Sequence, residues 1–182
     1  MFKPQKAFTL IELMVTICVL GTIIAIAIPN FNKQIRNSRS VALSEELITQ
    51  LNLARYEAVR RANRVTVCAS SNGTTCTGSW TDGYIVFVDR ATSDTAAAPD
   101  LGTPPEILKV VGKAYENAVI DVKRGATPVT FIRYTALGSL GRVAAGSVEI
   151  NSKIEGCTRG APKARTITIG VSGLISVQKT NC

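Results

Sequence analysis

The chain has 182 residues, of which 46% are hydrophobic, and a formal net charge of +8. This length suits one domain of ordinary size with an extension. The sequence has no histidine, which excludes histidine-based catalytic triads and histidine metal sites. Its serine and threonine residues lack an evident base, so we expect no enzymatic activity, no cofactor and no bound metal.

An apolar segment, residues 8–29, occupies the N-terminal end, and Glu12 is its only charged residue. A helix of this length extends about 30 Å, which matches the hydrocarbon core of a bilayer. Lys3 and Lys6 precede the segment, so we expect a transmembrane helix whose N-terminus faces the cytoplasm.

Glu12 is costly in such a segment. A carboxylate at the bilayer centre costs about 3 kcal/mol on insertion scales unless it is paired or lies near the interface. Glu12 therefore either reaches the headgroup region or pairs with a charge from another chain.

A second helix is expected over residues 30–63, continuous with the first across Pro29. Proline removes a helical hydrogen bond and predicts a bend or a weak point there. Apolar residues recur at three- and four-residue spacing beyond it, which is typical of an amphipathic helix. The stripe that we expect to pack on the following domain consists of Leu43, Leu47, Leu51, Ala54 and Ala58.

The remaining residues, 64–182, alternate with a period of two and are interrupted by glycine-containing turns, which predicts short antiparallel strands. Eight strands are expected, at 64–69, 84–89, 106–111, 118–122, 129–134, 147–150, 165–170 and 174–178. The predicted fold class is therefore α+β, a long N-terminal helical spine packed on an antiparallel β-sheet or sandwich domain.

Two features of this domain are expected to be solvated. The stretch 91–106 is rich in Ala, Pro, Thr and Asp and predicts an exposed loop, either a passive connection or a partner contact. Acidic residues at strand ends, Asp89 among them, are expected to face water.

Four of the five cysteines lie in this domain and allow three pairings. Cys68 and Cys76 flank an Asn-Gly turn that brings them together. We predict disulfides Cys68–Cys76 and Cys157–Cys182, which imply an oxidising compartment. The alternative of a four-cysteine zinc site lacks the usual CxxC pairs.

The N-terminal residues resemble a known signal. A basic leader ends in Ala7 and is followed by FTLIELM, with Glu12 at the fifth position after Ala7. This resembles the class III signal of type IV pilins and pseudopilins. The resemblance implies that a prepilin peptidase removes leader residues 1–7 by cutting between Ala7 and Phe8, and then methylates the amine of Phe8. It also implies that Glu12 pairs with the N-terminal amine of a neighbouring subunit, and that Pro29 serves as a bend. Most family members have glycine before the cut, so Ala7 is a departure.

Four further stretches resemble the FimT/FimU group of minor pilins and the H-type pseudopilin of type II secretion. They are LNLARYEAVRRANRVTVC (51–68), WTDGYIVFVD (80–89), TALGSLGRV (135–143) and RTITIGVSGLISV (165–177). The resemblance implies a structural subunit that helps initiate pilus assembly and lies at or near the pilus tip. Its implied partners are other minor pilins, the major pilin and the inner-membrane assembly platform. Before assembly it would cross the inner membrane once, with its C-terminus in the periplasm, and afterwards it would be extracellular. A type II secretion pseudopilin remains an alternative.

A DNA-binding role is a further alternative, because the FimT branch includes DNA-capturing pilins. Four basic residues cluster near the last cysteines and are candidate phosphate contacts: Arg159, Lys163, Arg165 and Lys179. The GRxR motif of that branch is absent, since the matching turn reads Gly173-Leu174-Ile175-Ser176.

The predicted Cys157–Cys182 bond has a measurable consequence. Closing a loop of this size stabilises a fold by about 3 kcal/mol in the chain-entropy model. Cys157→Ser is therefore expected to lower the melting temperature under oxidising conditions. A melting temperature equal to that of the wild type would show that the pairing is wrong.

Overall fold

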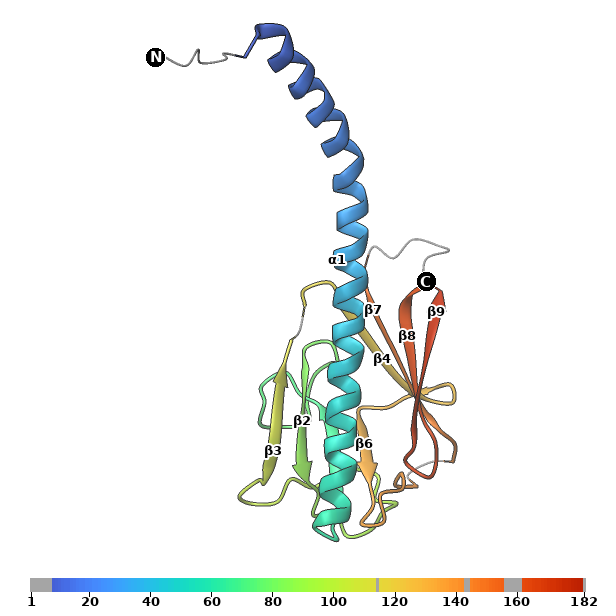
Figure 1. Cartoon of the computed structure of the whole chain (residues 1–182). Helices are drawn as coiled ribbons and strands as arrows, with labels where there is room; N and C mark the ends of the chain where they lie inside the picture. The colour runs from blue at the N-terminus through green and yellow to red at the C-terminus, as the bar shows by residue number, and fades with distance from the viewer. Residues whose placement is uncertain (1–7, 114, 143–144, 156–161, 182) are drawn as a thin grey trace, which may run out of the picture. The chain divides into compact units, whose positions relative to one another are not determined.

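A computed structural model describes residues 8–113, 115–142, 145–155 and 162–181. The chain forms two compact units, Met1–Ser38 and Arg39–Cys182 (Figure 1).

Helix α1 spans Leu10–Arg60, 51 residues that include Pro29 without a break in the helix. It ends where Ala62 adopts a left-handed conformation, with φ 47°. The amide of Asn63 then donates to the carbonyl of Ala58 at 3.1 Å, and the amide of Ala62 donates to the carbonyl of Val59. These bonds form a Schellman cap, which satisfies carbonyls that the end of a helix leaves free.

Within the described residues, the structure contains no helix long and apolar enough to cross a membrane.

The second unit holds two antiparallel sheets (Figure 1). The first has the order β3-β2-β1-β6, with bounds Ile107–Gly112, Gly83–Val88, Val65–Ala69 and Phe131–Tyr134. The second has the order β5-β4-β7-β8-β9, with bounds Thr127–Pro128, Ala118–Arg124, Val148–Ile154, Pro162–Ile169 and Ile175–Asn181. The predicted α+β class is confirmed.

All eight predicted strands are present, and the two-residue β5 is an addition. β7 is longer than predicted and continues to Ile154, because polar residues continue its inward-facing pattern. Ser152 is fully buried, and its hydroxyl lies 3.0 Å from that of Ser44 on α1. A paired hydroxyl is tolerated in a core where an unpaired one is costly.

The stripe on the C-terminal part of α1 is buried, as predicted, and joins both sheets in one core. Leu43, Leu47 and Leu51 are each 2% exposed, and Ala54 and Ala58 are fully buried. The same core includes inward-facing residues of both sheets, among them Val67, Val86, Ile150 and Ile167.

A second, smaller core lies on the other face of the first sheet. It is formed by Cys68, Ile85 and Phe87, with Leu101 packed against them. Since Leu101 belongs to the stretch 91–106, this stretch covers the sheet. The predicted loop is confirmed, since the stretch has no helix or strand and many of its residues are exposed, but it is not passive where Leu101 packs on the sheet.

The Cys68–Cys76 disulfide closes one end of this second core, as predicted. The turn between the cysteines is held by Asn72, whose side-chain oxygen accepts hydrogen bonds from the amides of Thr74 and Thr75, both at 3.0 Å. Gly73 has a φ of 73°, a conformation that glycine adopts without strain.

A buried ion pair holds the other end. The Asp89 carboxylate accepts from Arg133 Nε at 2.7 Å, and both side chains are inaccessible to solvent. The same carboxylate accepts from the Thr66 hydroxyl and from the amides of Ala91 and Asp100. The expectation that Asp89 is solvated is wrong, because the stretch after it folds back over it.

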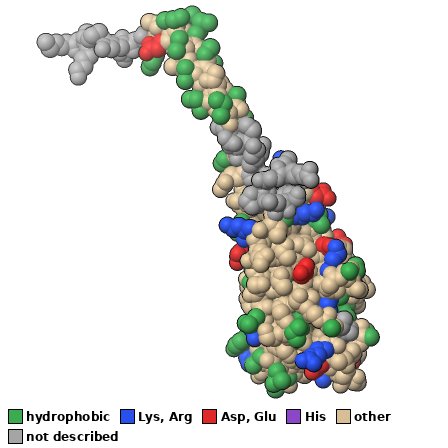
Figure 2. Space-filling model, turned by 90° about the vertical axis from the view of Figure 1, so that its right-hand side faces the viewer, with side chains coloured by type: hydrophobic (Ala, Val, Ile, Leu, Met, Phe, Trp, Pro, Cys, Tyr) green, Lys and Arg blue, Asp and Glu red, His purple; other side chains and the backbone are tan. Residues whose placement is uncertain are grey.

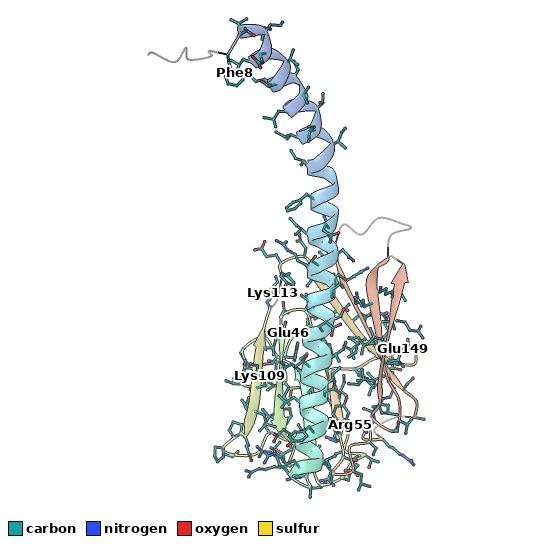
Figure 3. All side chains as sticks on the ribbon, in the orientation of Figure 1. Phe8, Glu46, Arg55, Lys109, Lys113 and Glu149 are labelled. Atoms are coloured by element: carbon teal, nitrogen blue, oxygen red, sulfur yellow. A yellow bond between two sulfur atoms is a disulfide. The ribbon has the colours of Figure 1, made fainter. Side chains whose placement is uncertain are left out.

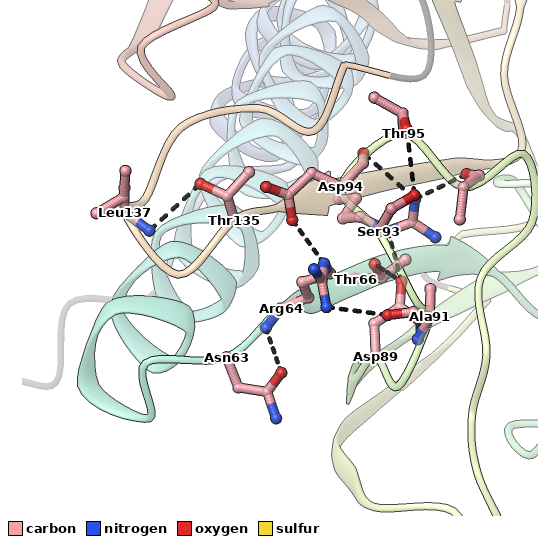
Figure 4. A network of polar contacts seen from close by, with 12 residues as sticks. Asn63, Arg64, Thr66, Asp89, Ala91, Ser93, Asp94, Thr95, Thr135 and Leu137 are labelled. Atoms are coloured by element: carbon pink, nitrogen blue, oxygen red, sulfur yellow. Dashed lines mark hydrogen bonds and ion pairs between the residues drawn. The ribbon is translucent and has the colours of Figure 1, made fainter.

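Arg133 also binds the covering loop directly. Its guanidinium donates to the carbonyls of Ala96 at 2.7 Å and Ala98 at 2.9 Å. Nearby, Arg64 donates to the Asp94 carboxylate at 2.5 Å and to the Ala91 carbonyl at 2.9 Å (Figure 4). These contacts fix the path of a segment that has no regular secondary structure of its own.

The Asp89 carboxylate should make stability acid-sensitive. Burial raises its pKa, but the hydrogen bonds from Thr66, the Asp100 amide, Arg133 and the Ala91 amide outweigh burial, so the pKa lies below its ordinary value. A lowered folded-state pKa contributes stability above the unfolded value of about 3.9, which is lost as pH falls through the folded value.

We therefore expect Asp89→Asn to cost about 3–5 kcal/mol at neutral pH, because it leaves Arg133 buried without a counter-charge. The variant should also lose part of the acid dependence. Urea unfolding followed by the fluorescence of Trp80, the only tryptophan in the sequence, measures both effects.

Glu57→Gln is the matched control. Hydrogen bonds from Arg60 and Arg61 lower the Glu57 pKa to about 2, yet these two arginines are 50% and 28% exposed, so solvent screens the cluster and it contributes less than a fully buried pair. Equal losses in the two variants would contradict the role assigned to the buried pair.

Candidate assembly segment and domain surface

The first turn of α1 is capped by Thr9. The Thr9 hydroxyl accepts a hydrogen bond from the Glu12 amide at 3.3 Å, which gives the T-x-x-E arrangement of a helix N-terminus. The Glu12 carboxylate also lies in the first turn, where the helix dipole favours a negative charge. The sequence T-L-I-E carries this signal, but sequence reasoning considered Glu12 only as a charge inside an apolar segment.

The apolar residues behind this turn cover every side of the helix. Every large hydrophobic side chain between Phe8 and Ile28 is exposed in the structure, from 81% for Phe8 to 46% for Ile24. Figure 2 shows hydrophobic side chains along this part of α1, and Figure 3 labels Phe8 at its start. A helix that is hydrophobic all round is normally buried, so these side chains are suited to an apolar environment.

Several predicted positions lie outside the described residues. They are Ala7 at the predicted cut, Arg159 among the candidate DNA contacts, and Cys157 and Cys182 of the second predicted disulfide. Lys163 belongs to β8. The roles predicted for these residues stay predictions.

Two of the candidate DNA contacts lie directly opposite each other. Arg165 on β8 is the register partner of Lys179 on β9. On its other side Arg165 is paired with Ser152 of β7, so the three residues form one row across the sheet. Neither Arg165 nor Lys179 forms an ion pair within the described parts of the second unit.

Sequence reasoning missed the role of Arg55, which joins three segments of the domain. Its Nε donates to the Gly138 carbonyl at 2.9 Å, and its NH2 group lies 3.5 Å from the Ser172 carbonyl. A Cβ built on Gly173 would lie 2.0 Å from the Gly138 carbonyl oxygen, so only glycine fits this approach. The two loops therefore meet beneath α1, and Leu137 and Leu174, exposed by 89% and 63%, extend from them.

No group of three or more potential metal-ligating side chains is found among the residues that the structure describes.

Comparison with known proteins adds two family matches. Residues 43–173 match the family model of the type II transport protein GspH, and residues 2–28 match the prokaryotic N-terminal methylation motif. The first match covers the C-terminal part of α1 and most of both sheets. The second covers the apolar segment with Glu12.

Curated relatives include a fimbrial protein of Pseudomonas aeruginosa, 29% identical over 127 residues, which are 67% of this chain and 80% of the relative. The type IV major alpha-pilin of Moraxella bovis is 46% identical over 45 residues, 25% of this chain and 28% of the relative.

Among solved structures, two crystal forms of the type IV minor pilin FimU of Pseudomonas aeruginosa have a similar fold. One has a TM-score of 0.53 at 21% identity, covering 81% of this chain and 90% of FimU. The other has a TM-score of 0.50 at 23% identity, covering 78% and 90%. With a GspH match over most of its length, a methylation motif before it and the fold of FimU, the chain belongs to the GspH family of type IV pilin-like proteins.

Proposed function

We propose that this protein is a minor type IV pilin that helps initiate pilus assembly and lies at or near the pilus tip. The observation that carries the proposal is the apolar N-terminal part of α1, with its exposed side chains and its single carboxylate. Leaving each Leu, Ile or Val side chain in water costs about 1.5–3 kcal/mol relative to burial, so this segment is suited only to lipid or to packing among other helices.

The proposed life cycle begins in the inner membrane, with the second unit in the periplasm. Prepilin peptidase cuts between Ala7 and Phe8 and methylates the new amine of Phe8. The methylation motif over residues 2–28 supports this step. The Cys68–Cys76 disulfide is consistent with an oxidising compartment for the second unit.

In the assembled filament, the segment over residues 8–29 packs among the corresponding helices of other minor pilins and the major pilin. Glu12 then pairs with the N-terminal amine of a neighbour, which sets the register between subunits. In lipid the same carboxylate lacks this partner, at a cost of up to about 3 kcal/mol that falls as the side chain approaches the headgroups. This difference favours transfer from the membrane to the filament by the assembly platform.

A role in the shorter filament of type II secretion uses the same helix and the same charge. The family's description as a type II transport protein supports this second candidate.

The charge of Glu12 can be tested separately from the fit of its side chain at the helix start. Glu12→Gln keeps a side chain that suits this helix position but removes the charge, whereas Glu12→Val removes both. We expect both variants to insert into the membrane and to be depleted from sheared pili, as measured by immunoblotting of the two fractions. Glu46→Gln, which changes an exposed carboxylate elsewhere on α1, is the control and should be incorporated normally. Normal recovery of Glu12→Gln in pili would rule out the registering charge.

DNA capture is a third candidate, favoured by the juxtaposition of Arg165 and Lys179. Two neighbouring cations neutralise few phosphates, and binding strength depends on the number neutralised. We therefore expect no mobility shift of duplex DNA at micromolar concentrations of the detergent-solubilised full-length chain. A shift that weakens with salt and with Arg165→Ala would replace the assembly role with DNA capture.

A further inference from the structure

The two sheets have four edges, and three of them are protected against pairing with another strand. β5 has two residues, one of which is Pro128, and it pairs only with Lys123 and Arg124 of β4; beyond it the Ile120 amide of β4 donates to the Thr81 hydroxyl. β6 is short, and Tyr134 at its end is bridged to Leu140. β3 carries the exposed Lys109, and a register shift interrupts its pairing with β2. Short length, proline, lysine and bulges are the devices that stop edge strands from accepting a partner.

β9 shares two of these devices with β3, an exposed lysine (Lys179) and a register shift at its far end, but neither interrupts its centre. It has seven residues without proline, and its register to β8 is regular from Ile175 to Thr180. Ser176, Val177 and Gln178 at its centre are uncharged and exposed. Figure 2 views the second unit from the side on which β9 lies in Figure 1, and much of this face is uncharged.

The outer side of β9 is unpaired in the described residues. Its only strand neighbour is β8, and no other backbone hydrogen bond reaches the strand from the described loops or turns. Its alternate amides and carbonyls therefore point to solvent, which is the arrangement that an added strand completes.

The charges near this edge indicate the chemistry of the partner. Arg165 and Lys179 face each other across β8 and β9, and like charges directly opposite destabilise a sheet. The next residue in the row is Ser152, whose hydroxyl is bound to Ser44 and offers no negative charge. A strand added to β9 would place a side chain about 5 Å from Lys179, where a carboxylate relieves the repulsion.

We propose that β9 accepts an extended segment of another protein by antiparallel strand addition. The segment carries a β-branched residue opposite Val177 and a carboxylate opposite Lys179. Main-chain hydrogen bonds supply the affinity, and these two side chains set the register.

The chain itself supplies a suitable probe. β8 already pairs with β9, with Arg165 opposite Lys179 and Ile167 opposite Val177. A synthetic peptide with the sequence of residues 164–170 carrying Arg165→Glu should therefore bind the free edge. The measurement is a fluorescence titration against the full-length chain in detergent micelles, with hydrogen-exchange mass spectrometry to locate the bound peptide.

We expect saturable binding and new amide protection in β9. Lys179→Glu should weaken binding about tenfold, because an attractive cross-strand pair becomes repulsive. The unmodified peptide of residues 164–170, which retains arginine, should show the opposite preference and bind the Lys179→Glu chain better than the wild type. Lys153→Glu changes an exposed residue of an inner strand and should leave both affinities unchanged.

Three results would overturn the proposal. They are no binding of either peptide, protection confined to β3 or to other elements, and affinities that do not exchange with the charge at position 179. Displacement of the peptide by duplex DNA in a manner that depends on Lys179 would also overturn it, in favour of nucleic acid as the occupant. Melting temperatures of the variants establish that each chain remains folded.

Discussion

The buried Asp89–Arg133 ion pair is the interaction on which the second unit most depends. It joins β6 to the segment that follows β2, and its two ions satisfy each other together with five backbone groups and the Thr66 hydroxyl. Desolvating two charges is costly, and only complete pairing offsets that cost. The result is a covering layer without helix or strand that still buries one face of the first sheet.

This layer explains why both faces of the first sheet are buried, although the composition of 91–106 predicted an exposed loop. β1 and β2 are buried at every position, because α1 covers one face and the stretch after Asp89 covers the other. The apolar run of β2 contained that information, since a strand with one solvated face alternates more strictly. The composition of 91–106 suggested an exposed loop because its order comes from Arg133, which is distant in sequence. Local patterns do not report such contacts.

The elements that depend on local pattern were predictable. The α1 stripe follows from helical spacing, and the eight strands follow from alternation and turn residues. What spacing cannot give is a residue's partner across the fold. Ser152 resembles a strand end until Ser44 is placed beside it, and Arg55 resembles a solvated charge until two loops converge on it. In the first unit, Glu12 has a local role at the helix start that the T-L-I-E spacing already indicated.

The two units differ in whether their own residues supply partners for buried charges and for apolar side chains. In the second unit the buried charge Arg133 has its partner within the chain, and the Asp89 pair therefore stabilises the subunit alone. In the first unit the apolar side chains of α1 lack an apolar environment within the described structure. The like charges Arg165 and Lys179 at the open edge of β9 are a second uncompensated feature. The core of the second unit is complete within the subunit, whereas the apolar helix and the open edge of β9 lack partners. Association supplies these partners without requiring the domain to refold, which suits the subunit to assembly.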